Sequence, residues 1–459
     1  MGEGESGMKQ ILIVDDDTAV TNYLMVFLVQ TGRFETSVVN DSREVPDLLA
    51  REKIDLVLLD MDMPHLSGMD ILRRMRKQGL DIPVVILTGV SDVDLAVRSM
   101  KLGAFDYLTK PVDEEKLLEV MDAALEHGAL HETLSQLPSE PCRDDLANQD
   151  AFQHLPTRDP AMIRLFQQAE KMASSDLSIF IWGERSTGKE ALARAIHKVS
   201  PRREGPFLAV NAAGQDPDRF PAALFGQARN YSGAKEESPG FLEEAAGGTL
   251  YIDEVEHLTL PVQVRLKRVI QTGEFYRESS TRIRKVDVRF ITASDKNPES
   301  ESYRGRFSDD LLCHLMINSI KMPPLRQRSG DIPLIADIFL KEAVERSGSG
   351  VGGFTSEVLD FLCRYDYPDN LQELKTIITA AVTNEEGPEL TIDSLPPYVR
   401  DRTGLGAPPD RRTFQPRAMG EVMREHAART TDYFGGNRAK AADTLQITPA
   451  ELEELLGGE

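Results

Sequence analysis

The chain has 459 residues, too many for a single hydrophobic core, and its 41% hydrophobic and 28% charged content is ordinary for a globular protein of roughly two to four domains. A net charge of −22 disfavours nucleic-acid binding by the chain as a whole, although a small basic segment could lie within it. No apolar run approaches the ~20 residues that span a bilayer, and the acidic N-terminus lacks the apolar core of a signal peptide. With three cysteines too far apart for a metal-ligand pattern, we expect a cytoplasmic protein with reduced thiols and no membrane partner.

Residues 8–127 alternate short apolar runs with helical segments, which predicts a parallel sheet covered by helices on both faces. The expected strands are ILIVD (11–15), IDLVLLD (54–60), VVILTG (84–89) and DYL (106–108). Ligands of open α/β sheets bind at the carboxyl edge of the strands. The polar residues expected at that edge are Asp15, Asp16, Asp60, Thr88 and Lys110.

These five residues point to phosphoryl chemistry. Three carboxylates at one edge would repel one another unless a cation lies between them, and Asp15, Asp16 and Asp60 offer the oxygen ligands that Mg²⁺ prefers. The Asp60 carboxylate could then attack a phosphoryl group. Lys110 would supply positive charge, and the Thr88 hydroxyl would donate to a phosphoryl oxygen. The alternative is an acidic cluster that is merely solvated.

The motifs LLDMDMP around Asp60 and YLTKP around Lys110 resemble the receiver family of two-component response regulators, over about 120 residues. This resemblance implies a flavodoxin-like fold and a phosphoprotein that receives its phosphoryl group on Asp60 from a sensor histidine kinase. It also implies that Tyr107 is the aromatic switch residue.

The remaining chain divides by composition. Residues 128–155 are polar and lack a clear period, which indicates a linker. A second α/β block follows and becomes helical from about Asp331. Residues 401–416, with Pro and Gly, indicate another linker before a small helical domain at 417–459. The strands expected in the second block are SIFIWG (178–183), PFLAVN (206–211), GTLYID (248–253) and VRFITAS (288–294).

The second block carries a nucleotide-binding pattern. GERSTGK (183–189) follows a strand and precedes a helix, the context of a phosphate-binding loop whose lysine reaches the β and γ phosphates. On a later strand, Asp253 would hold Mg²⁺ and Glu254 would polarise the attacking water. The expected cofactor-binding residues are Gly183, Glu184, Arg185, Ser186, Thr187, Gly188, Lys189, Glu190 and Asp253, with Glu254 as the catalytic residue.

Residues 156–400 resemble the AAA+ domain of NtrC-family activators of sigma-54 RNA polymerase. The resemblance rests on GERSTGKE, LFG (224–226), GGTLYIDEV (247–255) and MPPLRQRSGDIPLIA (322–336). It implies an α/β ATPase domain with a helical lid, in which ATP hydrolysis within a ring remodels the polymerase. It also implies that Asn211 couples the catalytic glutamate to the output loops.

Several positions depart from this family. The sigma-54 contact loop GAFTGA corresponds to NYSGA (230–234). The two arginines that the family places across the subunit interface correspond to Ser308 and His314. The remaining departures are Gln372 at the lid arginine, Asp295 at the sensor asparagine, and Arg185 and Ser186 at the usual Ser and Gly of the phosphate loop.

These departures predict weak catalysis. Arginine fingers stabilise charge in the transition state, typically by 10³–10⁵ in rate, whereas ground-state binding depends more on the phosphate loop and Mg²⁺. We therefore predict that ATP binds and turns over slowly or not at all. The alternative is that a nearby arginine substitutes, the candidates being Arg304, Arg306, Arg326 and Arg328.

The C-terminal motif YFGGNRAKAADTLQIT (433–448) resembles the Fis-type helix-turn-helix that ends NtrC-family proteins. The expected recognition helix reads PAELEELLGGE, and residues 417–459 hold five basic and eight acidic side chains, the reverse of a DNA-binding footprint. Arg438 and Lys440 could still touch phosphate, but we favour a dimerisation role.

Two functions remain open. One is an active sigma-54-dependent activator that hydrolyses ATP, contacts the polymerase and binds DNA. The other, which we favour because three output features fail together, is a phosphorylation-controlled interaction switch in transcriptional control. It would bind ATP and Mg²⁺ and assemble as a homo-oligomer or as a mixed ring with a related regulator.

Overall fold

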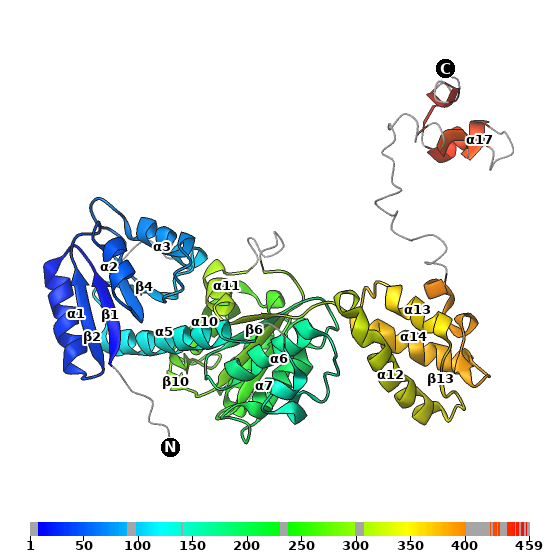
Figure 1. Cartoon of the computed structure of the whole chain (residues 1–459), viewed down its shortest axis with the longest axis horizontal. Coiled ribbons are helices and arrows are strands. Elements are labelled where there is room, and N and C mark those ends of the chain that lie inside the picture. Colours follow the sequence, from blue (N-terminus) through cyan, green and yellow to red (C-terminus); the bar gives the residue numbers. More distant parts are fainter. Residues whose placement is uncertain are drawn as a thin grey trace. The chain divides into compact units, whose positions relative to one another are not determined.

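The computed structural model describes residues 8–89, 98–138, 141–229, 237–298 and 307–400, together with parts of 423–456. The chain divides into two compact units, Met1–Ser394 and Leu395–Glu459. The first unit contains two parallel five-stranded sheets and a group of lid helices (Figure 1). Among the described residues, no helix combines the length and apolar character needed to cross a membrane.

The first sheet is that of the receiver domain. Its strands are all parallel in the order β2-β1-β3-β4-β5, which is the flavodoxin-like order predicted for this part of the chain. Apolar clusters lie on both faces of the sheet, under helices that begin at Asp17, Ser67 and Asp113, whose side chains cap the first turn. The elements are β1 (Lys9–Val14), α1 (Thr18–Gln30), β2 (Phe34–Val39), α2 (Val45–Arg51), β3 (Leu56–Asp60), α3 (Gly68–Lys77), β4 (Val84–Thr88), β5 (Asp106–Thr109) and α5 (Glu114–Ser135).

Helix α5 enters the segment that we expected to be an irregular linker, residues 128–155. It continues to Ser135, and two short 3₁₀ turns follow at Arg143–Asp145 and Gln149–Phe152. Leu130 and Phe152 are buried in the core of the AAA+ domain. The structure thus differs from the expectation, because a few apolar side chains anchor a mainly polar segment.

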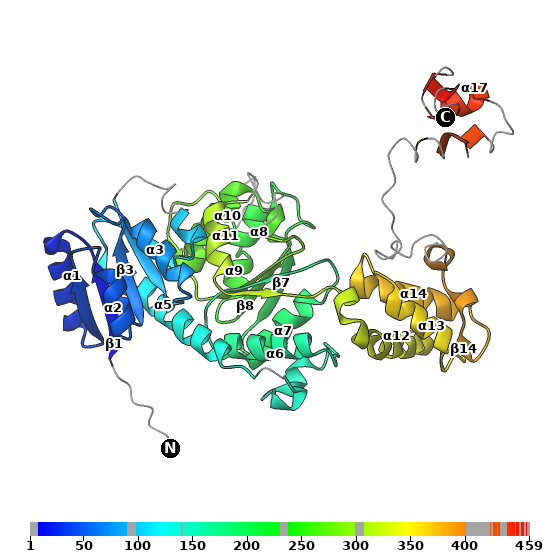
Figure 2. The same cartoon turned by 45° about the horizontal axis from the view of Figure 1, so that its top comes forward.

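The second sheet forms the AAA+ core, with parallel strands in the order β12-β6-β11-β8-β7. Helices α6 and α7 cover one face, and α8 to α11 lie on the other (Figure 2). The elements are α6 (Pro160–Ala173), β6 (Ile179–Trp182), α7 (Lys189–Val199), β7 (Phe207–Asn211), α8 (Phe220–Phe225), α9 (Phe241–Glu244), β8 (Thr249–Asp253), α10 (Leu260–Thr272), β9 (Glu274–Phe275), β10 (Arg284–Lys285), β11 (Arg289–Ser294), α11 (Asp309–Met316) and β12 (Ser319–Lys321).

The lid is helical from Ile332 onward, as the sequence predicted. Helix α12 packs against α14, and Tyr367 and Leu374 are buried among the lid helices. The elements are α12 (Ile332–Ser347), β13 (Gly353–Phe354), α13 (Ser356–Arg364), α14 (Asn370–Asn384) and β14 (Glu389–Leu390).

The described parts of the second unit include helix α17 (Arg438–Leu445) and a small core of Ala427, Ala442 and Leu452. Here Glu453 pairs with Arg438 at 3.1 Å, and the Glu451 carboxylate accepts from the Thr448 amide at 2.7 Å. The linker expected at 401–416 lies outside the described residues.

Candidate functional site

The acidic residues of the receiver meet at the carboxyl edge of its sheet. One oxygen from each of Asp15, Asp16 and Asp60 lies within 4.8 Å of the others. Asp15 follows β1 and Asp60 ends β3, and both are buried, whereas Asp16 is exposed. Three oxygen ligands at this spacing fit a hard divalent cation such as Mg²⁺, with one side open for a phosphoryl group.

Lys110 lies opposite these carboxylates. Its Nζ donates to Asp15 Oδ2 at 2.6 Å and also to Asp60 Oδ1. Burial raises the pKa of Asp60, while the bond from Lys110 opposes that rise and keeps the carboxylate available as a nucleophile. Thr88 ends β4 beside Asp60 in the sheet and is buried.

Close backbone packing fixes the position of Asp60, the expected phosphoryl acceptor. The amide of Asp62 donates to Asp60 Oδ2 at 2.9 Å. A Cβ on Gly68, at the start of α3, would lie 2.2 Å from the Asp60 carbonyl oxygen, so the approach requires glycine. The Asp60 carboxylate therefore has a defined orientation toward the cluster.

Tyr107 connects the receiver with the AAA+ domain. The Lys267 ammonium of α10 lies 5.1 Å from the centre of the Tyr107 ring and pairs with Asp310 of α11. Lys101 reaches Asp309 at 2.5 Å. The expected switch position of the receiver thus contacts α10, whose Lys267 pairs with α11, the helix that corresponds to the family's interface-arginine segment.

The phosphate loop between β6 and α7 has the expected shape. Gly188 has φ 105°, a value that disfavours other residues, and a Cβ on Gly183 would lie 2.6 Å from the Met322 carbonyl oxygen. Lys189 is 5% exposed and opens α7. The loop borders a cavity of about 490 Å³ whose lining includes Lys189 and Asp253. Such a loop at a helix N-terminus fits the phosphates of a nucleotide.

The acidic pair after β8 faces the same cavity. Asp253 ends β8, and burial raises the pKa of its carboxyl, which the positive charge of Lys189 opposes. Glu254 has φ 52° and accepts from Asn211 Nδ2 at 3.2 Å, so Asn211 touches the predicted catalytic carboxylate. Asp253 could hold Mg²⁺, and Glu254 could polarise a water beside it.

Contacts with the lid complete the loop. Ser186 has φ 55° and donates to Asp369 Oδ1 at 2.9 Å, while its carbonyl accepts from the Leu371 amide. The left-handed conformation explains why the family uses glycine at this position. Serine adds a hydroxyl that hydrogen-bonds to Asp369. Glu184 pairs with Arg326 at 2.5 Å. Thr187 Oγ1 donates to the Glu184 carbonyl, and Glu190 pairs with Arg194 on α7 at 2.7 Å.

The positions of the family's arginines have other roles in this chain. Ser308 caps α11 by accepting from the Leu311 amide. Burial lowers the pKa of His314, and its Nδ1 is buried without a hydrogen-bond partner among the described residues. Since histidine ordinarily titrates near ~6.5, His314 is largely uncharged at neutral pH. Gln372 is exposed on the lid.

Two of the arginines considered as substitutes contact the phosphate loop of their own chain. Arg328 is buried and donates to the Thr187 carbonyl at 3.0 Å, and Arg326 pairs with Glu184. Both therefore hold the loop in place. Arg304, Arg306 and the NYSGA segment at 230–234 lie outside the described residues.

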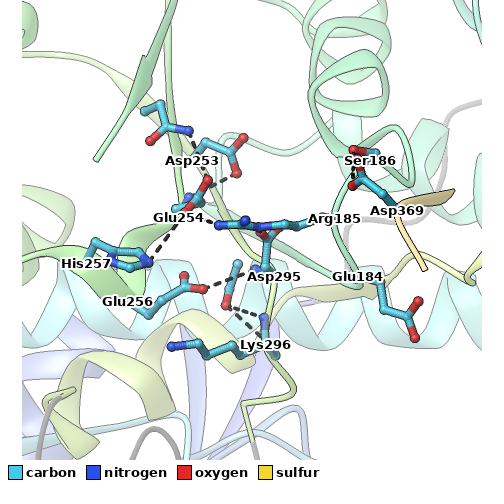
Figure 3. A network of polar contacts seen from close by, with 12 residues as sticks. Glu184, Arg185, Ser186, Asp253, Glu254, Glu256, His257, Asp295, Lys296 and Asp369 are labelled. Carbon is cyan, nitrogen blue, oxygen red and sulfur yellow. Dashed lines mark hydrogen bonds and ion pairs between the residues drawn. The ribbon is translucent and has the colours of Figure 1, made fainter. Parts of the chain in front are cut away.

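One arrangement was not predicted, namely the contact between two of the sequence departures. Arg185 Nε donates to Asp295 Oδ2 at 2.7 Å, and Arg185 also pairs with Glu254 at 3.4 Å (Figure 3). The sequence offered one indication of this contact, since Arg185 and Asp295 carry opposite charges and both were expected at the nucleotide site.

A receiver with an acidic acceptor cluster, joined to an AAA+ core with a phosphate loop, defines a response regulator with an ATPase-type output domain. Family models agree with this architecture. A response regulator receiver domain matches residues 11–122, a sigma-54 interaction domain matches 155–321, and an AAA+ ATPase lid domain matches 326–410.

Similarity extends along the chain. The transcriptional regulatory protein ZraR of Salmonella typhimurium is 34% identical over 449 residues, which cover 97% of this chain and 98% of ZraR. The regulatory protein LuxO of Vibrio parahaemolyticus is 32% identical over 456 residues, 97% of each chain. A crystal structure of NtrX from Brucella abortus in complex with ADP has a TM-score of 0.51 and 28% identity, covering 98% of this chain and 99% of that chain. The chain belongs to the NtrC family of response regulators.

Proposed function

We propose that this protein is a phosphorylation-controlled interaction switch of the NtrC type. A sensor histidine kinase phosphorylates Asp60, and the AAA+ domain binds ATP and Mg²⁺ with weak or absent hydrolysis. The chain then assembles with itself or in a mixed ring with a related regulator. The observation that carries this proposal is the state of α11, where Ser308 caps the helix and burial lowers the pKa of His314.

The physical reason is the missing positive charge. Hydrolysis places charge on the transferred phosphoryl group, and an arginine across the subunit interface ordinarily stabilises it. Neither Ser308 nor His314 can supply that charge, whereas the phosphate loop and Asp253 remain for ground-state binding. A ring of such subunits would hold nucleotide without a rapid cycle. NtrX crystal structures with ADP and with ATP support nucleotide binding by a chain of this architecture.

Turnover measured together with binding tests this proposal. We expect the purified full-length chain, with and without acetyl phosphate, to bind ATP and to release phosphate at least about a hundredfold more slowly than an arginine-containing family member. The measurement is phosphate release across a range of protein concentrations, beside equilibrium titration with a fluorescent nucleotide. Robust turnover that rises with concentration would instead favour the second function, an ATP-hydrolysing sigma-54-dependent activator, which the whole-length similarity to transcriptional regulatory proteins supports.

The C-terminal unit gives an independent prediction. Because Arg438 is paired with Glu453, and Glu451 also lies on the segment expected to enter the groove, DNA phosphates would meet negative charge. We expect no sequence-specific shift of promoter fragments by the full-length chain at moderate salt. A specific site bound at nanomolar concentration would restore the DNA-binding activator.

A further inference from the structure

The ammonium of Lys189 is fully occupied in this structure by groups of its own chain. Its Nζ donates to the carbonyls of Gly183 at 3.0 Å and Glu184 at 3.1 Å, and to Asp295 Oδ1 at 2.5 Å. A lysine ammonium has three donors, so every one is used. The partner that carries charge is Asp295, which stands where the family has a neutral asparagine.

The other cation beside the cavity is occupied in the same way. Arg185 donates to the second oxygen of Asp295 and pairs with Glu254, so its guanidinium lies between the two carboxylates (Figure 3). Its side chain is 66% exposed, whereas that of Asp295 is 15% exposed. The arginine can therefore move, but the carboxylate stays at the end of β11, beside the loop.

The charges around the cavity are unbalanced. Its lining includes the two cations and five carboxylates, which belong to Glu190, Asp253, Glu254, Asp295 and Asp369. The loop amides, the N-terminus of α7 and Lys189 together can hold a β-phosphate. A γ-phosphate requires Lys189, and it must lie beside Asp295 and Glu254 with one more negative charge.

We propose that the Asp295–Lys189 and Asp295–Arg185 ion pairs make this site selective for a nucleoside diphosphate over a nucleoside triphosphate. The inference rests on the proposed nucleotide binding and adds the form of the ligand. ATP places a γ-phosphate against the half-buried Asp295 carboxylate and competes with it for Lys189, whereas ADP brings no γ-phosphate beside that carboxylate. The resting state of the switch is then the ADP-bound form.

The test is a comparison of two dissociation constants in the full-length chain. We would titrate Mg·ADP and a non-hydrolysable Mg·ATP analogue by calorimetry. The expected result is ADP binding at least about tenfold more tightly than the analogue. Asp295→Asn should bring the two constants within about twofold by tightening the analogue, because Lys189 and Arg185 are then free for the γ-phosphate. Arg185→Ser should increase the ratio of the dissociation constant of the analogue to that of ADP, because the negative charge of Asp295 then lacks one of its two cationic partners.

Asp337→Asn is the matched control. It makes the same change of charge and shape on the exposed surface of α12, where Asp337 pairs with Lys341 at 2.7 Å and does not line the cavity, so the ratio of the two dissociation constants should stay within about twofold of that of the unmodified chain. Circular dichroism and the thermal unfolding transition show that each variant is folded. Equal binding of both nucleotides by the unmodified chain, or a ratio that Asp295→Asn leaves unchanged, would overturn this inference alone. Binding of neither nucleotide would overturn the proposed nucleotide binding as well.

Discussion

Asp60→Asn is expected to abolish phosphorylation of the purified chain by acetyl phosphate in the presence of Mg²⁺. Asparagine keeps the shape of the side chain but has no nucleophilic carboxylate oxygen, and it removes one negative charge from the cluster with Asp15 and Asp16. Chelation of Mg²⁺ should cause the same loss in the unmodified chain, because the three carboxylates then repel an incoming phosphoryl group. Incorporation of labelled phosphate, or the mass of the intact protein, measures the result.

Asp62→Asn is the matched control for that experiment. Asp62 lies two residues along the chain, is exposed, and contacts Asp60 through its backbone amide, which the substitution keeps. It makes the same isosteric change and removes the same charge, so phosphorylation should persist. Labelling that survives in Asp60→Asn would show that the phosphoryl acceptor is another residue. Labelling that disappears in both variants would show that the loss is not specific to Asp60.

The central strands of both sheets could be predicted from the sequence because they are buried on both faces. Strand β3, Leu56–Asp60, is buried at every position and is apolar up to its last residue, Asp60. The expected runs at 178–183 and 248–253 became β6 and β8 for the same reason. Where such strands end, polar residues mark the carboxyl edge, and the structure places the acidic residues of the receiver there.

One edge strand of each sheet was not predicted, for the opposite reason, although the other edge strands, β5 and β7, were expected at 106–108 and 206–211. Strand β2, Phe34–Val39, lies at the edge of the receiver sheet and has four exposed or half-buried residues between its buried ends. Strand β12, Ser319–Lys321, is a three-residue edge strand of the second sheet. An edge strand has a neighbour on one side only and tolerates polar residues, so its sequence resembles that of a loop.

The ion pairs of the nucleotide site could not be predicted from local pattern either. Arg185 and Asp295 are far apart in the sequence, and each alone reads as a departure from the family. What joins them is the order of the sheet, in which β11 lies beside β6. Only the fold shows that the charges of Arg185 and Asp295 neutralise each other. The change to Asp295, which in the sequence looked like the loss of the sensor asparagine, is therefore paired with the change to Arg185 at the same site.

Lys189→Ala is expected to weaken binding of a fluorescent ATP analogue by at least about a hundredfold, since hydrogen bonds to charged groups contribute about 1.5–3 kcal/mol each and a lysine reaches two phosphates. The fold should persist, because Asp295 keeps its bond to Arg185 and its carboxylate is not left unpaired. Lys198→Ala serves as the control, since Lys198 is an exposed lysine on the same helix and its removal changes the net charge equally. Unchanged affinity in Lys189→Ala would contradict the phosphate-loop assignment. Equal losses in both variants would show that the binding follows net charge and not the loop, so only a loss confined to Lys189 supports a nucleotide at this edge of the sheet.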